Sequence, residues 1–73
     1  SGCTVEEILF YVSQGSPVFA MTGSKSAVLV TGYSQTNIYY YDPADGSTKS
    51  MSIEAADKLF TKAGNLFFTY LNR

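Results

Sequence analysis

Few side chains in this sequence can do acid–base or nucleophilic chemistry, and none of its 73 residues is a histidine. The single cysteine, Cys3, needs a neighbouring base or a lowered pKa before its thiol becomes a nucleophile. Imidazole is the side chain that ordinarily exchanges protons near neutral pH. We therefore interpret Cys3 as an incidental thiol, and we predict that this chain is not an enzyme.

The carboxylate side chains stand where they would stabilise local structure. Glu6 and Glu7 fall in the first turn of an expected helix, and Glu54 falls in the first turn of a second one. Negative charge is favoured at both places by the helix dipole. Asp42 and Asp45 belong to the segment Asp-Pro-Ala-Asp-Gly, which is typical of turns. A weak calcium site at these two aspartates is a less favoured alternative, so we predict neither a metal nor a cofactor.

The spacing of apolar residues predicts the elements that position these side chains. Apolar residues recur at helical spacing after Thr4 and after Ser52, which predicts amphipathic helices over residues 4–14 and 53–63. Short apolar or aromatic runs bounded by glycine, proline and polar residues predict strands. The expected strands cover residues 17–22, 26–33, 38–41, 47–51 and 65–71.

The order of these elements, α-β-β-β-β-α-β, predicts the fold class. Connections of hairpin length favour an antiparallel sheet. We therefore expect an α+β fold in which two helices cover one face of about four to five strands. Residues 4–73 are expected to form a single domain, and residues 1–3 to be a linker or a remnant of cloning. Because the chain has one cysteine, a hydrophobic core rather than an internal disulfide must stabilise it.

Composition argues against several classes of partner. The net charge of −1 and the lack of a basic cluster argue against nucleic-acid binding. No run of about 18 apolar residues is present, so we expect no membrane span. Charged residues make up only 15% of the chain, whereas serine, threonine and tyrosine are abundant. This balance leans towards a secreted or cell-surface protein, and the compartment itself stays open.

Several short motifs follow one another in a distinctive order between residues 5 and 71. A helix is followed by Gly-Ser-Pro-Val, then by a strand that ends in Val-Thr-Gly-Tyr, then by Tyr-Tyr-Tyr-Asp-Pro. The segment Ser-Met-Ser-Ile-Glu-Ala-Ala and an aromatic strand complete the series. This order resembles the C-terminal half of the C39-like peptidases, which are cysteine peptidases with a papain-like fold. The resemblance implies that the α+β unit corresponds to the second half of that fold.

The resemblance also implies roles for individual positions. In that family a histidine at the start of a strand is the general base, and a later Asp-Pro supplies the aspartate that orients it. The histidine position falls on Ser26, Asp42 matches the aspartate, and Pro43 matches its proline. Gly32 and Tyr33 match the glycine and the aromatic residue that end the strand. A serine hydroxyl cannot replace imidazole as a base, so Ser26 and Asp42 are expected to be vestigial catalytic positions.

The function implied by the resemblance is binding without cleavage, because relatives that lost their nucleophile act as substrate-docking domains. We expect a non-catalytic binding or structural module of a larger bacterial protein. Its partner would be an extended peptide or the missing N-terminal half of its own protein, with Tyr33, Tyr40 and Asp42 as binding residues. Two alternatives stay open: the C-terminal fragment of a cysteine peptidase whose nucleophile lies upstream, and a generic α+β interaction module.

The same residues also have simpler structural interpretations. Asp42 opens a turn, and its carboxylate can accept hydrogen bonds from the backbone N–H groups of that turn. Ser26 begins a strand. Alternation along a strand places Tyr39 and Tyr41 on one face of the sheet and Tyr40 on the other. Core packing together with an exposed aromatic surface explains this tyrosine run without a ligand.

Overall fold

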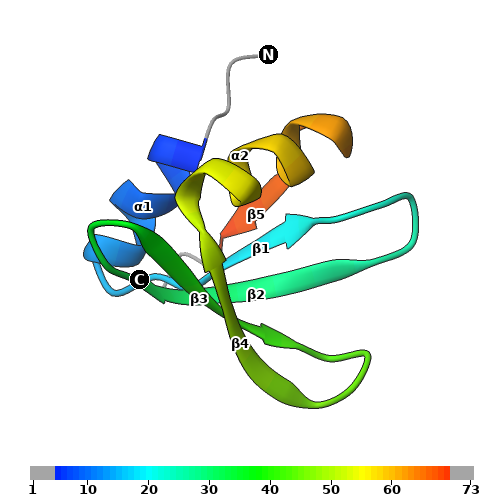
Figure 1. The fold of residues 1–73 in the computed structure, drawn as a ribbon, viewed down its shortest axis with the longest axis horizontal. Coiled ribbons are helices and arrows are strands. Elements are labelled where there is room, and N and C mark those ends of the chain that lie inside the picture. Colours follow the sequence, from blue (N-terminus) through cyan, green and yellow to red (C-terminus); the bar gives the residue numbers. More distant parts are fainter. Residues whose placement is uncertain (1–4, 70–73) are drawn as a thin grey trace.

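Two helices lie against one face of a five-stranded antiparallel sheet in the computed structural model, which describes residues 5–69 (Figure 1). The elements are α1 (Val5–Ser13), β1 (Val18–Met21), β2 (Ala27–Tyr33), β3 (Asn37–Asp42), β4 (Ser47–Ser52), α2 (Ile53–Lys62) and β5 (Phe67–Thr69). Their order confirms the predicted α+β fold class. The predictions made for residues 1–4, 70 and 71, including that for Cys3, lie outside the described residues.

The strands are arranged in the order β4-β3-β2-β1-β5, and each pair of neighbours is antiparallel. The first four strands form a meander of hairpins, as their short connections require. The chain then crosses the sheet as α2, and β5 returns to pair with β1. This last pairing brings the end of the described chain back beside β1, where Phe19 lies opposite Phe68.

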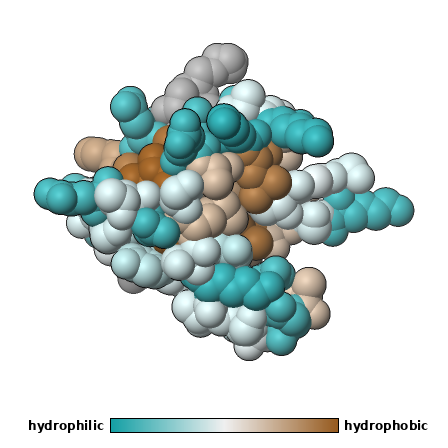
Figure 2. Space-filling model, in the orientation of Figure 1, coloured by the Kyte–Doolittle hydropathy of each residue, from teal (hydrophilic) through white to brown (hydrophobic). Residues whose placement is uncertain are grey.

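The core fills the space between the helices and the sheet. Residues that alternate along the strands point at the helices. Within residues 5–69 the buried hydrophobic side chains are Val5, Ile8, Val18, Ala20, Val28, Val30, Ile38, Ala56 and Phe60. Phe60 of α2 packs edge-on against Phe67 of β5, with the ring centroids 5.8 Å apart. Seen from the side drawn in Figure 2, hydrophobic residues gather between the two layers, and hydrophilic residues lie over the helices and at the hairpin ends.

The second helix begins and ends where the sequence predicts. The Ser52 hydroxyl accepts a hydrogen bond from the Ala55 N–H at 3.0 Å, which confirms it as the N-cap. After Lys62 the chain turns through Gly64, whose φ of 95° belongs to the left-handed region that glycine tolerates best. The helix therefore stops in time for β5 to return along β1.

A bulge in β2 changes the direction of its last side chains. The register with β3 shifts between Val30 and Gly32, so two residues of β2 oppose one residue of β3. As a result, Tyr33 lies opposite Ile38, on the side of the sheet that the helices cover. Gly32 leaves room beside the Tyr39 ring, which would lie 3.7 Å from a Cβ at that position. The bulge thus lies at a glycine, as is common for such irregularities within strands.

Neither helix within residues 5–69 is long and apolar enough to cross a membrane.

Candidate functional site

An open hollow lies where the start of β2 meets the end of β3. It has a volume of about 500 Å³, and its lining residues are Thr22, Lys25, Ser26, Ala27, Val28, Asp42, Pro43 and Ala44. The antiparallel register explains this meeting, since Leu29 pairs with Tyr41 and the next residue of β3 therefore stands beside Val28. The structure thus brings the two predicted vestigial positions, Ser26 and Asp42, into one hollow.

The Ser26 side chain is held by the turn between β1 and β2. The Thr22 hydroxyl donates a hydrogen bond to Ser26 Oγ at 3.0 Å, and the Thr22 N–H donates to the Ser26 carbonyl oxygen at 2.9 Å. A Cβ on Gly23 would lie 3.0 Å from Ser26 Oγ, so a larger residue there would require the Ser26 side chain to shift slightly. Ser26 is exposed, and the side-chain group that hydrogen-bonds to its Oγ is the Thr22 hydroxyl.

The Asp42 carboxylate closes its own turn and also lines the hollow. One oxygen, Oδ1, accepts a hydrogen bond from the Ala44 N–H at 3.0 Å, and the other, Oδ2, lies 3.5 Å from Lys49 Nζ. The Gly46 N–H donates to the Asp42 carbonyl oxygen at 2.8 Å, which completes the turn. The structural interpretation of Asp42 as a turn residue is therefore confirmed, and it is compatible with a place in the hollow.

A lysine governs the electrostatics beside this turn. Lys49 Nζ lies 2.6 Å from Asp45 Oδ2, and this hydrogen bond, followed by that from Ser47, lowers the pKa of Asp45 to about 2. The same contact raises the pKa of Lys49. The ammonium group stands between the two aspartates, where a calcium ion would have to bind. Among the described residues no group of three or more histidine, cysteine or acidic side chains is placed to hold a metal ion.

The two tyrosines predicted to bind a partner do not line this hollow. Tyr33 ends β2, at the opposite end of that strand from Ser26. Tyr40 faces the helices and packs, partly buried, against the core. Of the predicted binding residues, only Asp42 belongs to the hollow. A binding role for Tyr33 and Tyr40 stays a prediction for some other surface.

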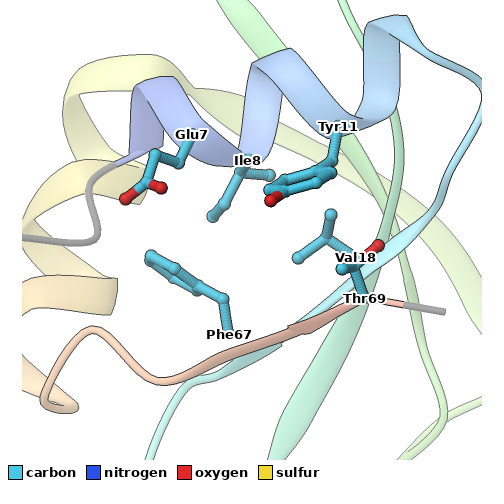
Figure 3. Close-up of a pocket in the computed structure, with 6 residues that line it drawn as sticks. All are labelled: Glu7, Ile8, Tyr11, Val18, Phe67 and Thr69. Atoms are coloured by element: carbon cyan, nitrogen blue, oxygen red, sulfur yellow. The ribbon is translucent and has the colours of Figure 1, made fainter. Parts of the chain in front are cut away.

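A smaller pocket lies between α1, β1 and β5 (Figure 3). It has a volume of about 180 Å³ and is lined by Glu7, Ile8, Tyr11, Val18, Phe67 and Thr69. Ile8 and Val18 are buried core residues, whereas Glu7 is exposed at the rim. An apolar cavity of this size accepts a group as large as a benzene ring. Sequence reasoning missed this pocket because it depends on the pairing of β5 with β1.

The exposed aromatic residues of the sheet were also missed as a set. Phe19, Tyr39, Tyr41 and Phe68 each keep a large part of their surface in solvent. Alternation along the tyrosine run correctly separates Tyr39 and Tyr41 from Tyr40. This alternation alone does not indicate which face of the sheet the helices cover.

No protein-family model, curated protein or solved structure was found to match this chain.

Proposed function

We propose that this chain is a non-catalytic, C39-peptidase-like domain that binds an extended peptide as part of a larger bacterial protein. One observation carries the proposal: Ser26 and Asp42 line the same hollow. These are the two positions that match the histidine and the orienting aspartate of the peptidases. The β2–β3 register places these two positions together, as the resemblance requires, and this agreement supports the proposal.

The hollow offers chemistry suited to a peptide backbone. Lys25 and Asp42 supply opposite charges, and the Thr22 hydroxyl supplies a further polar group. Val28, together with the exposed Pro43, adds apolar surface between them. A few polar groups set in an apolar lining are the usual composition of a binding site. An extended peptide presents alternating N–H and C=O groups that such a surface can satisfy.

Cleavage of the bound peptide is not expected. Acyl transfer by a cysteine peptidase requires a base that takes the thiol proton and returns it to the leaving amine. The partner of Ser26 Oγ is the Thr22 hydroxyl, which cannot take up a proton near neutral pH. A nucleophile supplied by another part of the protein would still lack its base at this position.

The proposal is tested by titrating the ¹⁵N-labelled chain with a degenerate pool of N-acetylated, C-amidated heptapeptides. We expect saturable shifts in the amide signals of residues 22–28 and 42–44, and no cleavage products by mass spectrometry. Ala44→Tyr should fill the hollow and weaken binding by about tenfold or more, which corresponds to about 1.4 kcal/mol. Ala55→Tyr is the matched control, because Ala55 is also exposed but lies on α2.

Shifts that are absent at millimolar peptide, or that centre on other residues, would contradict the proposal. Equal weakening by Ala44→Tyr and Ala55→Tyr would also contradict it. Cleavage of the peptides would instead favour the peptidase-fragment alternative.

A further inference from the structure

A row of apolar and aromatic side chains crosses the face of the sheet that the helices leave uncovered. The strand registers place Phe68 opposite Phe19, Phe19 opposite Leu29, Leu29 opposite Tyr41, and Tyr41 opposite Thr48. Residues directly opposite in antiparallel strands point to the same side of the sheet. The row therefore runs across all five strands, a width of about 20 Å at the usual spacing between strands.

The aromatic members of this face are well exposed. The exposed fractions are 57% for Phe68, 47% for Phe19 and 40% for Tyr41. Tyr39, which pairs with Gly32 beside the row, is 43% exposed. Four half-exposed aromatic rings on one face leave a contiguous apolar surface in water. Burying this surface against another protein surface would lower the free energy.

The face carries no charge among the residues that the structure describes. By register and alternation, its members are Phe19, Met21, Ala27, Leu29, Asn37, Tyr39, Tyr41, Thr48, Ser50, Ser52 and Phe68. Both helices pack on the opposite face of the sheet, so no element within residues 5–69 covers this one (Figure 1). The surface is thus an uncharged, largely apolar layer with hydroxyl groups at the β4 side.

We propose that this face is the interface of a weak symmetric dimer, formed with a second copy of the chain. Two copies related by a twofold axis present the same patch to each other. Because the patch is uncharged, this contact meets no like-charge repulsion and buries no ion. A strongly charged partner would leave its own charges unpaired against this surface. Packing of sheet on sheet, about 10 Å apart, is a common way to bury such faces.

The apolar surface area that each copy can bury limits how tightly the two copies bind. Four rings of about 200 Å², each near half exposed, offer about 400 Å² per copy, or about 800 Å² when two copies meet. Leu29, Met21 and the neighbouring hydroxyl-bearing residues raise this total towards the roughly 1,200 Å² at which specific interfaces begin. We therefore expect a dissociation constant on the order of 100 μM rather than a permanent dimer.

Sedimentation equilibrium of the 73-residue chain from micromolar to millimolar concentration tests the dimer. The mean mass should rise from 8.0 kDa towards twice that value. The double variant Phe19→Ser with Phe68→Ser should raise the dissociation constant at least tenfold. Phe10→Ser is the matched control, since Phe10 is 58% exposed but lies on α1. It should leave the dissociation constant unchanged within about twofold.

A chain that stays monomeric at millimolar concentration overturns the proposal, as does equal weakening by the control variant. Circular dichroism of each variant shows whether the fold persists. If the double variant is unfolded, the single variant Tyr41→Ser replaces it and should raise the dissociation constant by about threefold or more. The peptide titration concerns another part of the molecule, so either proposal can fail without the other.

Discussion

At the scale of the residue, the molecule keeps a carboxylate in its hollow but places no base beside it. Asp42 is retained by a turn that needs an oxygen acceptor for the Ala44 N–H. This hydrogen bond is a structural reason for an aspartate at this position, and it does not depend on catalysis. Ser26, in contrast, accepts one hydrogen bond, from the exposed Thr22 hydroxyl, and a serine is sufficient for that contact.

Lys49 controls the titration of the neighbouring turn. Its hydrogen bond lowers the pKa of Asp45 from 3.8 to about 2. Since the folded-state pKa lies below the unfolded value, the resulting stabilisation is complete above about pH 4 and is lost as the pH falls through about 2. Lys49→Met should return the Asp45 pKa towards its ordinary value, measured by carboxyl ¹³C NMR. Lys58→Met on α2 is the control and should leave it unchanged; a pKa near 2 in Lys49→Met would contradict this assignment.

At the scale of the element, much of the fold was predictable because its signals are local. The Ser52 cap, the helical spacing that includes Phe60, and the turn at Asp42 each depend on residues close in sequence. The meeting of Ser26 with Asp42 follows from one hairpin. The pairing of Phe19 with Phe68 joins distant segments, and no local pattern specifies it. For this reason the resemblance could link Ser26 with Asp42, whereas the sequence predicted neither the pocket under α1 nor the aromatic row.

Phe60 anchors α2 to the sheet and gives the clearest stability test. Its side chain is fully buried and contacts Phe67 at the ring edge. Phe60→Ala should cost about 3–5 kcal/mol, enough to unfold much of so small a domain. Phe60→Leu, which keeps most of the volume, should cost about 1.5 kcal/mol and remain measurable by urea denaturation. Phe10→Ala, at an exposed position, should cost less than about 1 kcal/mol. Equal costs for Phe60→Leu and Phe10→Ala would contradict the placement of Phe60.

At the scale of the whole molecule, the two layers leave one face of the sheet to interact with another surface. If that surface is a second copy, association must stabilise the folded chain by mass action. The melting temperature of the wild-type chain should then rise by about 4 °C between micromolar and millimolar concentration. In the Phe19→Ser, Phe68→Ser variant this rise should be clearly smaller. A concentration-independent wild-type transition would contradict the dimer.

If Ser26 occupies the position of a peptidase's catalytic base, as we propose, its side chain faces Asp42. The 73-residue chain contains no histidine. The imidazole introduced by Ser26→His therefore gives the only histidine signals in its NMR spectrum. A facing carboxylate should raise its pKa above the ordinary value of about 6.5 by about half a unit or more. Ser24→His is the matched control, because both positions adjoin Lys25 and only Ser26 lines the hollow with Asp42.

We would measure this pKa first, in Ser26→His, in Ser24→His and in Ser26→His combined with Asp42→Asn. We expect a raised pKa in the first variant alone, with the other two near the ordinary value. Equal pKa values in all three variants would mean that Ser26 and Asp42 do not face each other, and would contradict the assignment of a vestigial peptidase site.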